Sequence, residues 1–230
     1  MFLLSLAMIS HSCFAQFEDI LTYEDDYDYH STNGKENATG VVLTNFYESN
    51  SKVLVRSRNT PIVNGKQDTS AAQDQNKVVF DFGTQKQMTI DANAKKAIVT
   101  GFMVNITNQV MKTTNADITI QNHGPEKIGQ YSCTHFEITN KKNRKDIDLW
   151  ITKDLGTSNN FFAGPWLYYP RGSLEVNKLV AAGGDGVVLK WKAGKASATL
   201  ASTQNQPFRP GFFDPPKGYT VVEQNFPGRQ

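Results

Sequence analysis

Cysteine and histidine, from which most zinc and thiol sites are built, are scarce in this sequence. Only two cysteines and four histidines occur among its 230 residues. The histidines are well separated, and neither an H-x-x-x-H nor a C-x-x-C spacing is present. A zinc site is therefore not expected, and we expect neither a metal nor any other cofactor.

A strong field of one charge sign is also missing. Lysine and arginine total 24 against 22 aspartate and glutamate residues, a net charge of +2, which gives no reason to expect a nucleic-acid partner. The acidic run at Asp25, Asp26 and Asp28 lacks the D-x-D-x-D-G arrangement, so a solvated edge is favoured over a calcium site. The GGDG run at 183–186 completes no phosphate-loop motif, and we expect a tight hairpin turn there.

Hydrophobic runs long enough to cross a bilayer, which takes about 20 residues, are absent as well. The mostly apolar stretch at 2–9 is too short for a span but suits the core of a signal peptide. We expect cleavage after Ala15, leaving one domain at 16–230 that is periplasmic or secreted. A lipoprotein signal at Cys13 is the alternative, although the residues before it lack the usual leucine.

What the chain does contain is a succession of short alternating segments bounded by turn residues. We expect strands at 22–30, 41–48, 52–58, 78–82, 87–91 and 96–100, with two more after residue 186. Residues 59–77 are polar and are expected to form an exposed loop. Strands this short and this regularly spaced favour an antiparallel sheet over βαβ units.

Helical signal is limited to two places. In the first, apolar residues recur on one helical face, although their β-branched members leave a strand open: Phe102, Met103, Ile106, Val110 and Met111. The second, 173–183, has Ser173 as a cap, Glu175 in its first turn and Gly183 as its stop. The tryptophans Trp150, Trp166 and Trp191 are expected to anchor the core.

The stretch from 128 to 156 is predicted to be a β-hairpin with strands at 130–139 and 146–154. Cys133 and His135 share a strand face about 7 Å apart, with Glu137 next along it. A thiol in mid-strand lacks the helix N-terminus that commonly lowers a nucleophile's pKa. We therefore favour a buried structural thiol, and a Cys133-dependent hydrolase remains the alternative.

The basic turn of this hairpin holds the densest cluster of positive charge: Lys141, Lys142, Arg144 and Lys145. One interpretation is a charged tip that discourages edge-to-edge pairing of sheets. The other is contact with anionic lipid headgroups or with an acidic partner.

The same hairpin resembles the signature of a secreted bacterial family, of the Bacteroidetes type, known only as a domain of unknown function. The matching residues are Ile128, Tyr131, Cys133, Phe136, Trp150, Thr152, Lys153, Asp154 and Leu155. The ending PGFFDPPKGY resembles the family's closing block at Phe213, Pro216, Gly218 and Tyr219. This sequence departs from the family's pattern at two positions: Gln130 is inserted between Gly129 and Tyr131, and Phe136 stands where tyrosine is usual.

That family is similar to the periplasmic lipoprotein carriers of the LolA and LolB type. The resemblance implies a mainly β (α+β) fold, in which short helices cover the concave face of a curved, incompletely closed antiparallel half-barrel. It also implies a non-enzymatic role in which an acyl chain or a lipoprotein binds within the concavity. A hydrophobic ligand would then contact Phe102, Met103, Ile106, Val110 and Trp166. A structural or interaction module of the cell envelope, with a filled core, is the alternative, and the oligomeric state is left open.

Overall fold

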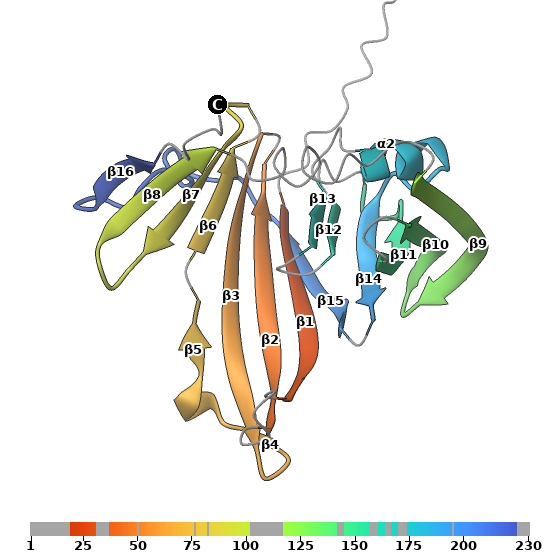
Figure 1. The fold of residues 1–230 in the computed structure, drawn as a ribbon, viewed down its shortest axis with the longest axis horizontal. Helices are drawn as coiled ribbons and strands as arrows, with labels where there is room; N and C mark the ends of the chain where they lie inside the picture. Colours follow the sequence, from red (N-terminus) through yellow and green to blue (C-terminus); the bar gives the residue numbers. More distant parts are fainter. Residues whose placement is uncertain are drawn as a thin grey trace, which may run out of the picture.

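One large open β-sheet dominates the computed structural model (Figure 1). The structure describes residues 19–30, 37–49, 51–75, 77–81, 83–101, 117–141, 145–156, 161–163, 167–169, 174–194 and 196–224. The expected fold class, a mainly β protein with a curved sheet that does not close into a barrel, is confirmed. Among the described helices, none has the length and apolar character that crossing a bilayer requires.

The first half of the chain supplies the long central strands and one wing of the sheet. These elements are β1 (Asp19–His30), β2 (Asn37–Glu48), β3 (Lys52–Val63), β4 (Lys66–Gln67), the 3₁₀ turn η1 (Thr69–Ala71), β5 (Gln73–Asp74), β6 (Lys77–Asp81), β7 (Lys86–Asp91) and β8 (Lys96–Gly101). The strands expected in this half are confirmed, most of them with longer bounds. The side chains of Asp25, Asp26 and Asp28 lie outside the described part.

The second half builds the other wing and then returns to the first. Its elements are β9 (Ile118–Ile128), β10 (Tyr131–Asn140), β11 (Lys145–Thr152), β12 (Phe161–Ala163), β13 (Leu167–Tyr169), α2 (Leu174–Ala181), β14 (Val187–Ala193), β15 (Ala196–Asn205) and β16 (Thr220–Gln224). The predicted hairpin is β10 and β11, and the predicted second helix is α2. Strands β12 and β13 form a small separate sheet.

Neighbouring strands run in the order β16-β8-β7-β6-β3-β2-β1-β15-β14-β11-β10-β9. Sequence-adjacent hairpins account for most of this order. We call the strands from β1 to β8 the first wing and those from β9 to β15 in this sheet the second wing; the pairing of β1 with β15 joins them. Nearly every described pair is antiparallel, as expected. The exception is β16, which runs parallel to β8 and brings the last described residues to the far edge of the sheet.

Residues 59–77 are not the open loop that their polarity suggests. β3 continues to Val63, where Asn64 and Gly65 take positive φ angles of 53° and 73°. An Asn-Gly pair of this kind turns a two-residue hairpin, so β4 folds back onto β3, followed by η1 and β5. The segment stays largely exposed but is hydrogen-bonded, and the Asn-Gly dipeptide was the sequence signal for it.

The two faces of the sheet carry separate hydrophobic cores. On β3, Val53 belongs to a large cluster that includes Val176 and Leu179 of α2, whereas the next residue, Leu54, belongs to a second cluster. Successive side chains of a strand point to opposite faces, so the clusters lie on opposite sides of the sheet. We call the α2 side the inner face and the opposite side the outer face.

The inner core is closely packed in the part of the chain that is described. Phe46, Val53 and Leu179 are no more than 1% exposed, and Tyr23 donates a hydrogen bond of 2.6 Å to the carbonyl oxygen of Val188. Trp191 belongs to this core, as predicted. Trp150 does not, because it lies half-buried on the outer face, and Trp166 lies outside the described residues.

Candidate functional site

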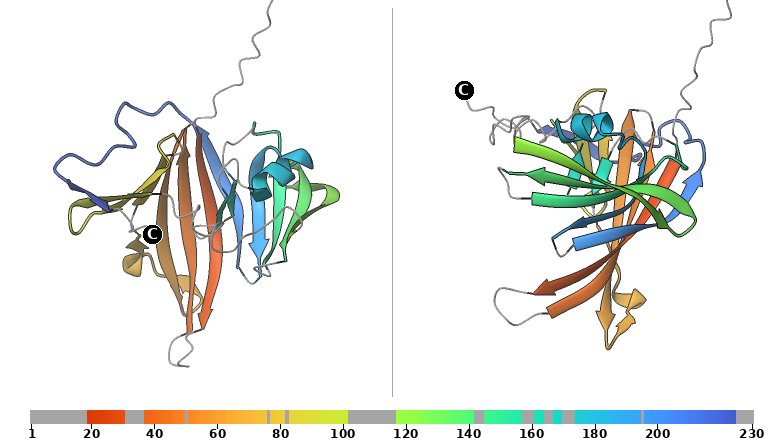
Figure 2. Two further views of the ribbon diagram at one scale, coloured as in Figure 1. Left: turned by 45° about the horizontal axis from the view of Figure 1, so that its top comes forward. Right: turned by 90° about the vertical axis from the view of Figure 1, so that its right-hand side faces the viewer.

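The outer core is covered by a segment that we call the strap, residues 206–219. It leaves the end of β15, passes along the outer side of the first wing and enters β16 beside β8 (Figure 2). Four prolines in this stretch, at 207, 210, 215 and 216, withhold backbone donors and keep it out of regular strand or helix. Its far end is fixed where the Thr220 amide donates to the carbonyl oxygen of Lys95 at 3.0 Å.

Aromatic contacts hold the strap against the sheet. Phe212 lies with its ring centroid 5.4 Å from that of Tyr47 on β2, and 4.8 Å from that of Phe208. Phe213 contacts both other phenylalanines edge-on, at 5.1 and 5.2 Å. Pairs with this spacing add about 0.5–1.5 kcal/mol each beyond the apolar area that they bury.

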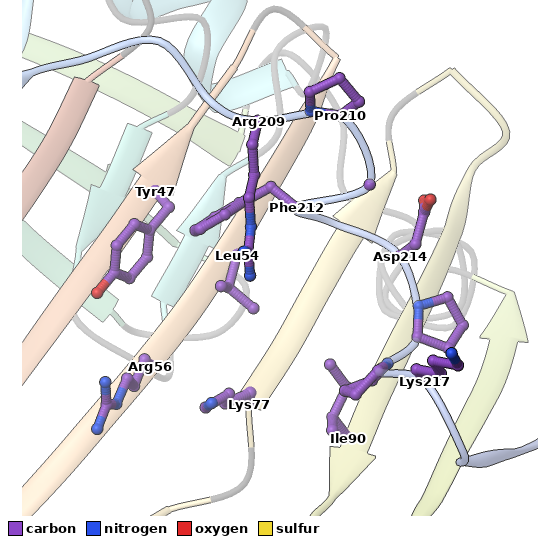
Figure 3. Close-up of a pocket in the computed structure, with 13 residues that line it drawn as sticks. Tyr47, Leu54, Arg56, Lys77, Ile90, Arg209, Pro210, Phe212, Asp214 and Lys217 are labelled. Carbon is purple, nitrogen blue, oxygen red and sulfur yellow. The ribbon is translucent and has the colours of Figure 1, made fainter.

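Between the strap and the sheet lies a cavity of about 550 Å³. Its lining comes from four strands and the strap: Tyr47, Leu54, Arg56, Lys77, Ile90, Arg209, Pro210, Gly211, Phe212, Asp214, Pro215, Pro216 and Lys217. Leu54 and Ile90 are buried and form its floor, while Tyr47 and Phe212 form an aromatic wall (Figure 3). Its volume is within the range of roughly 300–1,000 Å³ typical of small-molecule sites.

The rim of the cavity is cationic. Arg56 and Lys77 come from the sheet, Arg209 and Lys217 come from the strap, and Asp214 is the one acidic residue among the described residues of the lining. Arg56 is paired with Asp74 at 3.3 Å, outside the lining. Within the described part of the chain, the other three cations have no carboxylate within ion-pair distance. The cavity thus combines an apolar floor with an excess of positive charge.

Among its described residues, the lining contains no histidine, cysteine, serine or threonine. Its apolar floor and cationic rim suit the binding of an amphiphile. An apolar chain would contact Leu54, Ile90 and Phe212, and the polar end of the same molecule would meet the rim.

The ligand-contacting residues expected from the sequence, Phe102, Met103, Ile106, Val110 and Trp166, lie outside the described residues, so their arrangement stays a prediction. The cavity that is described lies on the outer face, away from α2. Sequence reasoning missed its lining, although the run PFRPGFFDPPKG, with its prolines, aromatics and cations, was a visible signal.

Cys133 and His135 do not form a reactive pair. The Cys133 thiol is buried and lies 3.5 Å from the carbonyl oxygen of Glu126, to which it donates. Burial, followed by the negative charges of Glu126 and Asp154, raises the pKa of this thiol above its ordinary value. A nucleophilic cysteine requires a lowered pKa, so these surroundings favour a structural thiol.

His135 instead belongs to a row of stacked side chains across the outer face of the second wing. Its ring stacks on Trp150 at 4.3 Å and on His123 at 4.6 Å, and the Lys190 ammonium lies 4.8 Å from the centroid of the Trp150 ring. Carboxylates flank the row, with Glu126 bound to both His135 and Trp150. Glu137, considered as an orienting group for His135, contacts His123 at 3.1 Å instead.

The GGDG run is not the hairpin turn that its composition suggests. It connects the end of α2 to the start of β14, and Gly183 takes a φ of +89° that closes the helix. A Cβ at Gly186 would lie 2.3 Å from the Thr152 carbonyl oxygen, so glycine is required by close backbone packing. Asp185 is paired with Lys153 at 2.6 Å. Of the basic hairpin turn, only the exposed Lys141 lies fully within the described residues.

Comparison with solved structures gives distant likenesses. PNGF-II is 15% identical with a TM-score of 0.45; the match covers 92% of this chain, which spans about a third of PNGF-II (31%). An uncharacterised conserved protein from Thermus thermophilus is 10% identical, with a TM-score of 0.41 and coverage of 90% and 91%. A LolA superfamily protein from Nitrosomonas europaea is 9% identical, with a TM-score of 0.31 and coverage of 87% and 91%.

No curated protein matches this chain. A family model does, over residues 62–219, which include both sequence blocks that resembled a domain of unknown function and the whole strap. The match extends over more than half of the sequence. The chain therefore belongs to the family described as a domain of unknown function, DUF4412.

Proposed function

We propose that this protein is a non-enzymatic binding protein for a hydrophobic ligand, with an acyl chain held in the cavity beneath the strap. The observation that supports the proposal is the cavity itself, which is about 550 Å³ in volume and has Leu54 and Ile90 as its floor. A single apolar chain placed there would be removed from water, which contributes roughly 0.8 kcal/mol for each buried methylene. An exported carrier of acyl chains or lipoproteins, with residues 1–15 as its signal peptide, is the wider role that we infer.

The inner face is the other position at which such a ligand could lie. There Phe102, Met103, Ile106, Val110 and Trp166 are the proposed contacts. The described inner-face residues are tightly buried, with Phe46 at 1% and Val53 at 0% exposure, which favours the outer cavity. A filled inner core also suits the alternative of a structural module of the envelope.

Direct binding measurements test the proposal. The whole chain, stripped of lipid, is titrated by calorimetry with four amphiphiles: laurate, dodecyl phosphate, 1-dodecanol and dodecyltrimethylammonium. Their alkyl chains have eleven carbons in laurate and twelve in the others, and each is kept below its micellar concentration or, for 1-dodecanol, below its solubility limit. We expect at least one of them to bind with one molecule per chain. If none of the four binds, the proposal is wrong, and the structural-module role takes its place.

A pair of variants locates the site. Ile90→Ala removes apolar contact from the cavity floor and should weaken binding by about tenfold, since one buried aliphatic side chain contributes about 1.5–3 kcal/mol at most. Val221→Ala makes a similar truncation at a valine that is 51% exposed and lies outside the cavity lining. It should bind as the parent does. Equal binding by both variants would place the ligand elsewhere.

A further inference from the structure

We infer that the ligand is an anionic amphiphile, whose carboxylate or phosphate is held by Lys77, Arg209 and Lys217 at the rim of the strap cavity. This inference rests on the proposed function and specifies the chemistry of the polar end of the ligand. It starts from the arrangement of charged and apolar positions on two neighbouring strands.

On the outer face of β3 and β6, an apolar pair is followed by a cationic pair. Leu54 lies opposite Val79 in the strand register. Two residues from this pair on each strand, Arg56 on β3 and Lys77 on β6 line the same cavity. On this face of the sheet, the apolar residues and the cations thus lie about 7 Å apart along the strands. An amphiphile lying along the strands would meet both.

The strap adds two further cations above the same floor. Figure 3 shows Arg209 reaching down beside Phe212 toward Leu54, and Lys217 close to Ile90. These two cations are separated along the chain by the prolines and glycine of the strap. The course of the strap across the sheet therefore places both cations above the floor formed by Leu54 and Ile90.

Charge balance favours an anion over a neutral head. Among its described residues, the lining holds Arg56, Lys77, Arg209 and Lys217 against the single Asp214, and Asp74 neutralises part of the charge near Arg56. Like charges around a cleft repel one another and concentrate counter-ions there. Arginine and lysine donate their strongest hydrogen bonds to carboxylate and phosphate oxygens, so an anionic head would relieve this repulsion.

The four amphiphiles test the inference because their alkyl chains are nearly equal in length while their heads differ in charge. We expect laurate or dodecyl phosphate to bind at least tenfold more tightly than 1-dodecanol, with dodecyltrimethylammonium weakest. The ratio of laurate to dodecyl phosphate tells a carboxylate site from a phosphate site. If 1-dodecanol binds as tightly as both anions, the inference is overturned while the proposed function stands. If no amphiphile binds, both are overturned.

Matched charge variants separate a local site from the general charge of the protein. The variant Lys77→Gln/Arg209→Gln/Lys217→Gln removes the three exposed rim cations and should lose at least tenfold in affinity for the anions, with 1-dodecanol unchanged. The control Lys66→Gln/Lys96→Gln/Lys127→Gln makes the same change in net charge at exposed lysines outside the cavity lining. It should lose less than twofold. Equal losses in both variants would overturn the inference.

Discussion

Cys133 is held as a neutral thiol by its surroundings. Its side chain is 4% exposed and donates to the Glu126 carbonyl oxygen, and burial together with nearby carboxylates raises its pKa. Because the thiolate is the reactive form, the folded protein holds less of it at any given pH than an unfolded chain does.

We expect Cys133 in the native protein to react with a disulfide reagent at pH 8 about a hundredfold more slowly than in urea, because both access and thiolate fraction are reduced. The rate should rise with pH through the range above the ordinary cysteine pKa of about 8.5. Absorbance of the released thiol measures both rates. Rapid labelling of the native protein, at the rate seen in urea, would reopen the alternative of a reactive thiol.

Gly186 illustrates a residue whose identity is set by backbone packing. A Cβ there would lie 2.3 Å from the Thr152 carbonyl oxygen and 2.8 Å from Ile151, and neither the backbone nor a packed core side chain yields easily. We expect Gly186→Ala to lower the free energy of unfolding by about 1–3 kcal/mol, as overpacking does. Urea unfolding measures the change.

Gly101→Ala is the matched control for this prediction. A Cβ at Gly101 would meet no atom within 4 Å, and its φ is not positive. This variant should unfold within about 0.5 kcal/mol of the parent. A similar loss in both variants would show that the contact at Gly186 is not the cause.

Among the elements, α2 is stabilised chiefly by the face that it buries. Eight residues are too few for a helix to be stable on its own in water. Val176 and Leu179 pack into the inner core, while Val180 is 45% exposed. Glu175 in the first turn and Gly183 after the last turn match the helix-start and helix-stop signals that the sequence offers.

Two neighbouring truncations test this dependence. Leu179→Ala should lower the free energy of unfolding by about 2–5 kcal/mol because Leu179 is 0% exposed within the core. Val180→Ala should change it by no more than about 0.5 kcal/mol. Thermal and urea unfolding of both variants measure the difference. Equal stability of the two would mean that α2 contributes little to the inner core.

At the scale of the whole molecule, the sheet separates two cores that are covered by different elements. The inner core joins both wings and α2, whereas the outer core lies on the first wing and has Phe212, Phe213 and Tyr219 packed against it. The separation follows from strand alternation: Val53 and Leu54 are adjacent in sequence, yet they face opposite sides.

A ligand in the strap cavity should therefore be insensitive to changes on the inner face. We expect Leu179→Ala to destabilise the protein but to bind laurate within about twofold of the parent, whereas Ile90→Ala should weaken binding about tenfold. Calorimetry at a temperature where both variants remain folded makes the comparison. The reverse pattern would move the ligand to the inner face, beside Phe102, Met103 and Trp166.

The sequence by itself determined the local part of this structure. Alternation of apolar and polar residues located most of the strands, and turn residues located the hairpin of β10 and β11. These features depend on neighbours within a few residues, so a sequence pattern carries them. Where a local signal was overlooked, as at Asn64 and Gly65, a folded-back segment was interpreted as an open loop.

Only the tertiary structure decided where the candidate site lies. Leu54 and Ile90 come together because β6 pairs with both β3 and β7. Arg209 reaches them because β1 pairs with β15 and β16 pairs with β8, which holds both ends of the strap. Strand order of this kind depends on pairing between residues far apart in the chain, and the period-two alternation within one strand does not specify that strand's partner. For the same reason, Cys133 and His135 form a plausible reactive pair in the sequence, but in the folded protein His135 is paired with Glu126 and stacks on Trp150 instead.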